Sequence, residues 1–312
     1  DYAIMVPIVE MSESPYQMDF INYYYEREYE NRDANRDIKE RCIKEILEKK
    51  KLSPQNVYKK RKTFFPQMDK IEIDITFDCN LKCKGCNRSC GLAPSRERMD
   101  LQDIKRFVQE SIQLNIKWKL INILGGEPTL HPQLKDILGI LQTEYADAFN
   151  NDVIIQVVSN RYTKQSRNIC EEIKSFKNVR IDYESTKDDN EIGYFTPFAD
   201  APIDDPNFKD EDYQKACWVA SYCGIGLNKN GYYGCSVCGG ISRVLNDGEG
   251  VKSLAELTES VIKSHFEKYC KLCGNFKHYS NSHGDFLLRC EKDSFREIIS
   301  PTWERLYKEY NR

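Results

Sequence analysis

The chain has 312 residues, of which 40% are hydrophobic and 30% charged, and its formal net charge is −3. No uninterrupted apolar run approaches the roughly 20 residues of a membrane-spanning helix, and the small net charge gives no reason to expect nucleic acid. The apolar opening stretch AIMVPIV is short and lacks the basic flank of a signal peptide. We therefore expect a globular, cytoplasmic protein that binds neither membranes nor nucleic acid.

The cysteines are the outlier of the composition. There are 13 of them, and most lie in groups separated by two or three residues. An odd count, close spacing and the lack of a secretion signal argue against a disulfide framework and favour metal ligation.

Hydrophobic periodicity divides the chain into three parts. Residues 1–69 read as a helical N-terminal extension with polar, tyrosine-rich helices over about 17–31 and 35–50. From residue 71 onward, strands alternate with amphipathic helices. The predicted strands cover 71–77, 118–124, 153–159 and 179–185, and the predicted helices cover 100–115, 132–145 and about 165–176. Such alternation predicts an α/β fold with a parallel sheet or barrel.

The polar motifs follow the predicted strands at their carboxyl ends, where parallel sheets place ligand sites. Cys79 follows the first strand, the GGEP sequence of residues 125–128 the second, Ser159 and Asn160 the third, and Asp182 closes the fourth. After residue 186 the alternation fades into a loop-rich stretch. A second cysteine-rich unit begins at residue 217 with a predicted hairpin turning at residues 230–231, and the tail from 294 is expected to be a helix interrupted at a proline.

The first cysteine group places three thiols after a strand, in the sequence CNLKCKGC. Thiolates suit zinc or an iron–sulfur cluster. A structural zinc site needs four ligands, whereas Cys79, Cys83 and Cys86 supply three unless Cys90 joins them. If these three hold three irons of a [4Fe–4S] cluster, the fourth iron keeps an open position for a small chelating ligand.

This combination resembles the radical SAM enzyme superfamily over about residues 70–185. The spacing Cys-x3-Cys-x2-Cys after the first strand and the GGEP after the second carry the resemblance. It implies a partial (β/α) barrel with S-adenosylmethionine (SAM) bound to the open iron of a [4Fe–4S] cluster held by Cys79, Cys83 and Cys86. One departure is Gly85, which stands where relatives often carry an aromatic residue near the adenine.

The resemblance also implies roles for further residues. Gly125 and Gly126 would offer backbone atoms, and Glu127 a carboxylate, to the ammonium group of SAM. Ser159 and Asn160 would contact its ribose or methionyl part.

Two acids of the fourth strand form a candidate substrate site. Asp182 and Glu184 share a face by the period-two rule, which in a barrel would be the interior, and they could orient substrate groups or accept a proton. Acidic side chains at strand ends are equally often solvated, and that interpretation stays open.

The second cysteine set has two interpretations. The pairs Cys235-x2-Cys238 and Cys270-x2-Cys273 resemble a zinc ribbon with one structural ion. Alternatively, Cys217, Cys235, Cys270 and Cys273 resemble the twitch domain of radical SAM enzymes, a shortened SPASM domain that holds one auxiliary [4Fe–4S] cluster. The hairpin between the first two of these cysteines favours the twitch interpretation, which leaves the roles of Cys90, Cys223, Cys238 and Cys290 unassigned.

The resemblance predicts an N-terminal extension over 1–69, a radical SAM partial barrel over 70–216 and a twitch-like domain with a closing helix over 217–312. The expected activity is reductive cleavage of SAM to a 5′-deoxyadenosyl radical that abstracts a hydrogen atom from a substrate carbon, for oxidation of a small molecule. A one-electron donor such as flavodoxin or ferredoxin would supply the electron. The alternatives are a ribosomal-peptide maturase, in which Cys223 could return a hydrogen atom, and a non-enzymatic zinc or iron–sulfur protein.

Overall fold

The computed structural model describes residues 63–183, 185–187, 194–195, 197–277, 288–289 and 299–312, which all belong to one compact unit. The helices expected over 17–31 and 35–50 lie outside the described residues, as do Cys42, Glu184 and Cys290. None of the helices in the described part of the chain is long and apolar enough to cross a membrane.

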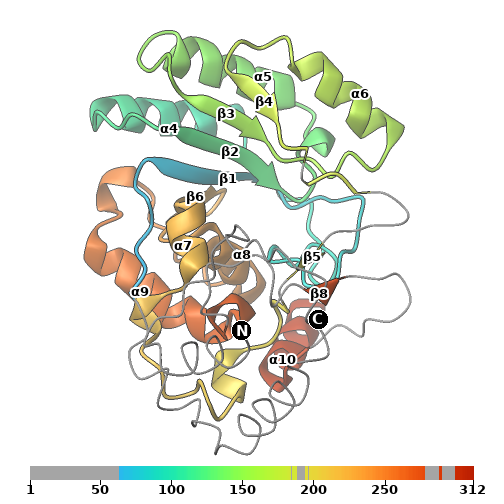
Figure 1. The fold of residues 1–312 in the computed structure, drawn as a ribbon, viewed down its shortest axis with the longest axis vertical. Helices are drawn as coiled ribbons and strands as arrows, with labels where there is room; N and C mark the ends of the chain where they lie inside the picture. The colour runs from blue at the N-terminus through green and yellow to red at the C-terminus, as the bar shows by residue number, and fades with distance from the viewer. Residues whose placement is uncertain (1–62, 184, 188–193, 196, 278–287, 290–298) are drawn as a thin grey trace, which may run out of the picture. The chain divides into compact units, whose positions relative to one another are not determined.

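A six-stranded sheet organises the unit, with the strand order β4-β3-β2-β1-β6-β7 (Figure 1). Its strands are β1 (Lys70–Thr76), β2 (Leu120–Gly125), β3 (Ile154–Val157), β4 (Val179–Ile181), β6 (Ile225–Asn228) and β7 (Gly231–Tyr233). All neighbours are parallel except the hairpin of β6 and β7. A second, two-stranded sheet pairs β5 (Tyr194–Phe195) with β8 (Leu288–Arg289). The mostly parallel α/β architecture confirms the predicted fold class.

One face of the sheet is apolar and covered by helices. Alternate residues of β1, namely Ile71, Ile73 and Ile75, are fully buried. The helices α4 (Leu101–Gln113), α5 (Leu134–Ile140) and α6 (Lys164–Ile173) lie on the same side of the sheet (Figure 1). Because side chains alternate between faces, the intervening polar residues of β1 point to the opposite face. We call that opposite face the inner face.

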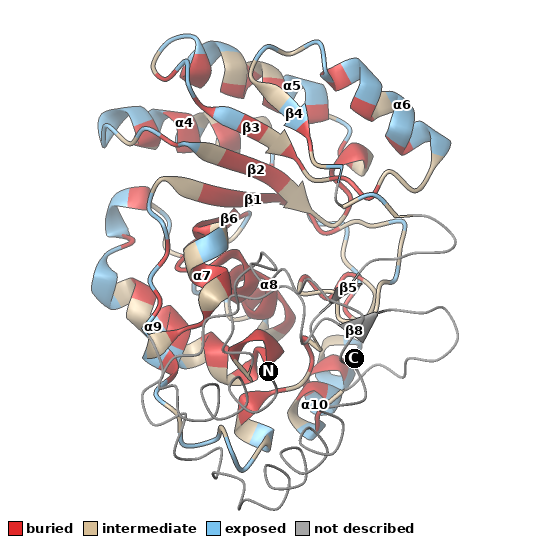
Figure 2. Cartoon of the chain, in the orientation of Figure 1, coloured by how far each residue is buried: buried red, intermediate tan, exposed pale blue. Residues whose placement is uncertain are grey.

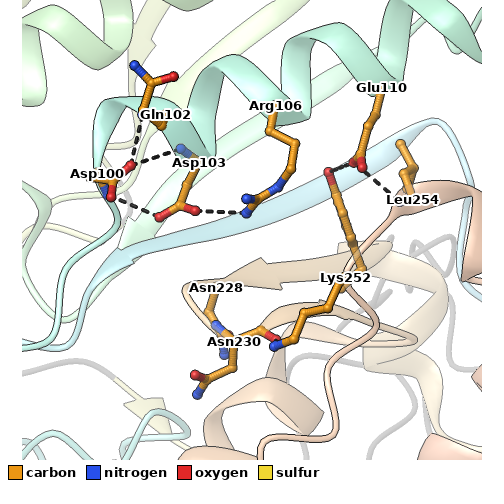
Figure 3. Close-up of polar contacts among 10 residues, drawn as sticks. Asp100, Gln102, Asp103, Arg106, Glu110, Asn228, Asn230, Lys252 and Leu254 are labelled. Carbon is orange, nitrogen blue, oxygen red and sulfur yellow. Dashed lines mark hydrogen bonds and ion pairs between the residues drawn. The ribbon is translucent and has the colours of Figure 1, made fainter.

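Helix α4 shows how local sequence sets the helix boundaries (Figure 3). The Asp100 side chain accepts hydrogen bonds from the backbone N–H groups of Gln102 and Asp103, and the Asp103 side chain accepts from the Asp100 N–H. This capping box satisfies donors that the first helical turn leaves free. Further along the helix, Glu110 accepts a hydrogen bond of 2.6 Å from the Tyr232 hydroxyl and so ties α4 to β7.

The chain after residue 217 packs largely below the sheet. It contains α7 (Trp218–Cys223), α8 (Ser236–Leu245), α9 (Glu259–Tyr269), the short helix η7 (Cys270–Leu272) and α10 (Pro301–Tyr310). Helix α8 contacts β6 and β1 and is buried over almost its whole length (Figure 2). The predicted hairpin is confirmed, but its first strand lies beside β1 in the main sheet, a pairing that the sequence pattern did not predict. The proposed domain boundary at residue 217 stays a prediction.

The closing helix differs in one respect from its prediction. Helix α10 begins at Pro301 with Ser300 before it, so the proline starts this helix rather than interrupting it. Proline suits the first helical position because its fixed φ is helical and the backbone donor it lacks would have no partner there.

Candidate active site

The first cysteine loop leaves the carboxyl end of β1. Cys79, Cys83 and Cys86 are each partly exposed, in contrast to Cys90, which is buried. The backbone N–H of Leu81 donates to the Cys79 sulfur over 3.5 Å. The loop therefore presents its three predicted ligands at the end of the sheet where the sequence placed them.

The thiols of this loop influence one another. A hydrogen bond from the Cys90 thiol lowers the pKa of Cys86 to about 6, and burial raises the pKa of Cys79 to about 11. The charge of Cys86 contributes to the raised pKa of Cys79. Clustered thiols next to one that ionises easily are a donor set that fits an iron–sulfur cluster. Cys90 thus supports Cys86 rather than packing as an isolated apolar side chain.

The GGEP turn after β2 packs tightly against the start of this loop. Gly125 has φ +128°, and a Cβ atom there would lie 2.1 Å from the Thr76 carbonyl oxygen. The Gly126 N–H donates to that carbonyl over 2.7 Å, and the Glu127 N–H donates to the Asp78 carbonyl over 2.8 Å. Because these donors are engaged, the groups the turn can offer to a ligand are its carbonyl oxygens, which suit a cationic amine.

Glu127 joins the ends of two strands. It is fully buried, and its Oε1 accepts hydrogen bonds from the Thr129 N–H, the Thr129 hydroxyl at 2.6 Å and the Ser159 hydroxyl at 2.8 Å. Its Oε2 accepts from the Asn160 N–H over 2.8 Å. The Asn160 side chain donates in turn to the Asn80 side chain, over 2.8 Å, inside the cysteine loop. The motifs after the first three strands therefore form one connected polar network.

The candidate substrate residues lie at two ends of the sheet. Asp182 directly follows β4 and accepts a hydrogen bond from the Ser185 hydroxyl over 2.5 Å. Glu184 lies outside the described residues. Cys223 ends α7 just before β6, whose Ile225 pairs with Ile71 at the start of β1. Cys223 is thus at the end of the sheet opposite to the first cysteine loop, and its proposed hydrogen-donor role stays a prediction.

A buried charge cluster connects β1 and the first cysteine loop to helix α8. This cluster was not predicted from the sequence. Arg88 donates to Glu72 over 2.7 Å and to Asp74 over 3.2 Å, and all three side chains are buried. Glu72 also accepts a hydrogen bond from the Ser236 hydroxyl at the start of α8. Burial beside the second carboxylate raises the pKa of Asp74 to about 6. The sequence signal for this cluster was a pair of acidic residues, Glu72 and Asp74, two positions apart in the first predicted strand.

The second cysteine set surrounds a buried cavity. Five cysteines line it, each no more than 8% exposed: Cys217, Cys235, Cys238, Cys270 and Cys273. Apolar side chains such as Val219, Val237, Ile241 and Phe266 make up much of the remaining wall. The structure therefore brings together the four cysteines of the twitch interpretation and also Cys238, so the four cysteines of the zinc-ribbon interpretation line the same cavity.

Short structural elements position these thiols. Cys217 and Cys235 are the residues that precede the first turns of α7 and α8. Cys270 begins η7, and Cys273 directly follows it. A hydrogen bond from Cys238 lowers the pKa of Cys235, whereas burial raises the pKa of Cys273. A positive helix N-terminus favours thiolate at Cys235. A dry, all-thiol donor set fits an iron–sulfur cluster or zinc.

The arrangement of the donors is relevant to whether the second site suits zinc or an iron–sulfur cluster. Among the described residues, no three His, Cys, Asp or Glu side chains are arranged around a position for a single metal ion. A four-iron cluster binds each thiolate through a different iron, so its ligands need not converge on one point. The described part of the chain contains no disulfide.

Helix α8 connects the two cysteine sites. It starts at the second site, and its later turns contact the first loop: Arg243 donates to the Ala93 carbonyl over 2.6 Å and also to the Arg88 carbonyl. A Cβ atom added at Gly240 would lie 2.9 Å from the Asn87 carbonyl oxygen, so the loop runs directly over this glycine. At 1.5 Å per residue, the contacts on α8 lie about 10 Å from Cys235.

Comparison with known proteins agrees with this geometry. Residues 73–203 match the family model described as the radical SAM superfamily. That part of the chain is similar to radical SAM domains, and it contains the cysteine spacing and the GGEP from which the resemblance was predicted.

Individual relatives are more distant. A probable GTP 3′,8-cyclase from Methanococcus maripaludis is 30% identical over 78 residues, which are 25% of this chain and 26% of that protein. The solved structure of BtrN in complex with AdoMet and 2-DOIA aligns with 68% of this chain and 89% of its own, at 13% identity and a TM-score of 0.39. Streptococcus suis SuiB aligns with 52% of this chain and 30% of its own, at 18% identity and a TM-score of 0.27.

Proposed function

We propose that the chain is a radical SAM enzyme that cleaves S-adenosylmethionine reductively and abstracts a hydrogen atom from a carbon of its substrate. The observation that carries this proposal is the network in which buried Glu127 joins the end of β3 to the GGEP turn and, through Asn160 and Asn80, to the cysteine loop. When bound, a [4Fe–4S] cluster and SAM supply the 5′-deoxyadenosyl radical.

The residues of the first site have distinct tasks. Cys79, Cys83 and Cys86 would hold three irons and leave the fourth open. The carbonyls of Gly125 and Gly126 would accept hydrogen bonds from the ammonium group of SAM, because an ammonium group is a donor only. Glu127 carries three hydrogen bonds on Oε1 and one on Oε2. Its Oε2 therefore retains acceptor capacity for the same ammonium group.

The second site would hold an auxiliary [4Fe–4S] cluster on thiols drawn from Cys217, Cys235, Cys270 and Cys273. Its buried, apolar walls exclude water and oxygen from such a cluster. The first electron would come from an external one-electron donor such as flavodoxin or ferredoxin.

The net reaction that fits two such sites is the oxidation of a small molecule by two electrons. Loss of a hydrogen atom leaves a substrate radical, which gives up one further electron and one proton to form a double bond. The second site lies about one short helix from the first loop and can take the electron, and a carboxylate such as Asp182 can take the proton.

The test is release of 5′-deoxyadenosine from SAM by anaerobically reconstituted, reduced protein, measured by chromatography with Cys83→Ala as the inactive control. The proposal predicts release by the wild type and none by the variant. If cluster-loaded wild-type protein never releases it, even with candidate substrates, the radical function is wrong.

A further inference from the structure

Four polar side chains lie side by side across the inner face of the sheet. Glu72 of β1 is paired in register with Asn122 of β2, Asn122 with Gln156 of β3, and Gln156 with Arg180 of β4. Parallel strands in register place such side chains at one level, about 4.8 Å apart from strand to strand. We call these four residues the polar row.

Three members of the polar row have partners. Glu72 is bonded to Arg88 and Ser236, and the Arg180 Nε donates to the Gln156 Oε1 over 2.6 Å. Gln156 is half-buried and Arg180 is exposed, so the β3–β4 end of the row is accessible within the described part of the chain. The Glu72 end of the polar row is therefore buried, with its charge neutralised by Arg88. The Arg180 end is accessible and carries a positive charge.

Asn122 is the exception. Its side chain is only 9% exposed, and its Oδ1 is buried with no hydrogen-bond partner in the structure. Buried polar atoms are almost always bonded, so an acceptor without a donor in the middle of a sheet needs an explanation. Asn150, which is 8% exposed, shows the usual arrangement: its side chain donates to the Trp118 carbonyl over 2.8 Å.

We propose that Asn122 Oδ1 is a substrate-binding acceptor that takes a hydrogen bond from an O–H or N–H group of the substrate. The Arg180 guanidinium, two strands further along the polar row, would donate to an oxygen acceptor on the same molecule. The ligand class is thus a small polar molecule that carries a hydroxyl or amino group and an acceptor oxygen. This inference rests on the proposed function, because it assigns the substrate of that same site.

The depth of Asn122 separates it from the cofactor. The residues assigned to SAM lie at the carboxyl ends of the strands, whereas Asn122 precedes Gly125 by three residues on β2, a distance of about 10 Å along the strand. The half-buried side chain of Leu124 lies between these levels on the same face. A substrate held at Asn122 would therefore sit below the cofactor, inside the partial barrel.

The test compares Asn122→Leu with Asn150→Leu in cluster-loaded protein. Leucine is close to asparagine in shape, so Asn122→Leu removes an acceptor without a partner and should raise the melting temperature by about 2–4 °C. Asn150→Leu breaks bonds that the fold uses and should lower it. A fall in the Asn122→Leu melting temperature comparable to that of Asn150→Leu would show a structural role and overturn the inference.

SAM affinity and SAM cleavage complete the test. Asn122→Leu should bind SAM with unchanged affinity in equilibrium dialysis, and weaker binding would mean that Asn122 contacts the cofactor, which also overturns the inference. Failure of the proposed function is visible separately, because wild-type protein would then release no 5′-deoxyadenosine whatever the melting temperatures show.

Discussion

The two cysteine sites of this chain differ in exposure and in number of thiols. The first is a loop at the end of a strand, with three partly exposed thiols set among polar groups. The second is a cavity between helices, where five thiols are buried among apolar side chains. An exposed three-thiol site leaves room for an exchangeable ligand, whereas a buried set with more thiols than a cluster needs is closed. We infer that the first site does the chemistry and the second stores an electron.

Helix α8 contacts both cysteine sites. Its first turn carries Cys235 and Cys238, and Arg243 near its end donates to two carbonyls of the first loop. Substitutions that affect one site and spare the other would support distinct roles for the two sites, whereas equal effects would show that the sites act alike.

The largest effect is expected from removing a thiol of the first site. Cys83→Ala should reduce 5′-deoxyadenosine release below detection, because two thiols do not hold a cluster with one open iron. Its melting temperature should stay close to that of the wild type, since Cys83 is partly exposed.

The matched change in the second site is Cys273→Ala. This thiol is 6% exposed, so its loss from the packed wall of the cavity should lower the melting temperature. SAM cleavage should persist, because the first site is unchanged. Equal losses of cleavage in both variants would contradict the division of labour between the sites.

The charge cluster between the sites should show a pH-dependent effect. Folding raises the pKa of Asp74 from 3.8 to about 6, so the wild type loses stability as the pH rises between these values. Asp74→Asn lacks this cost and should be more stable by up to about 3 kcal/mol at pH 7.5, and by roughly half as much at pH 5.

Melting temperatures at the two pH values measure this difference. Asp69→Asn is the control, because Asp69 pairs with Lys119 in a half-exposed salt bridge. Such a pair contributes little to stability, so this variant should show no comparable gain. If the difference in melting temperature between Asp74→Asn and the wild type is the same at both pH values, Asp74 is not the group that titrates.

A smaller effect is expected from the GGEP turn. A Cβ atom at Gly126 would lie 2.2 Å from the Asp78 carbonyl oxygen, so Gly126→Ala should cost about 2 kcal/mol and weaken SAM binding. Gly139→Ala in α5 is the matched control, because no atom lies within 4 Å of the added methyl group. Thermal unfolding and SAM dialysis of both variants measure the effect, and equal behaviour would refute the tight packing of the turn.

Local signals in the sequence were sufficient to place the residues that are proposed for the first site at the ends of the strands. Strand periodicity and the GGEP placed β1 to β4 and the strand ends where Cys79, Gly125 and Ser159 lie. These features depend on residues close together in the chain.

Contacts between distant segments were not predictable in this way. The pairing of β6 with β1, the presence of both Cys217 and Cys238 in one cavity and the Arg88 cluster each join segments more than 100 residues apart or depend on how a helix packs. Sequence spacing gave Cys235-x2-Cys238 as a pair, but only the orientation of α8 shows that both thiols face the cavity.

The most direct test of the two-site account is the content of iron, sulfide and zinc in anaerobically reconstituted wild-type protein. The account predicts about eight irons and about eight sulfides per chain, four of each per cluster. A content of about four irons with one zinc per chain would contradict it, because the second site would then hold a structural ion that cannot accept an electron.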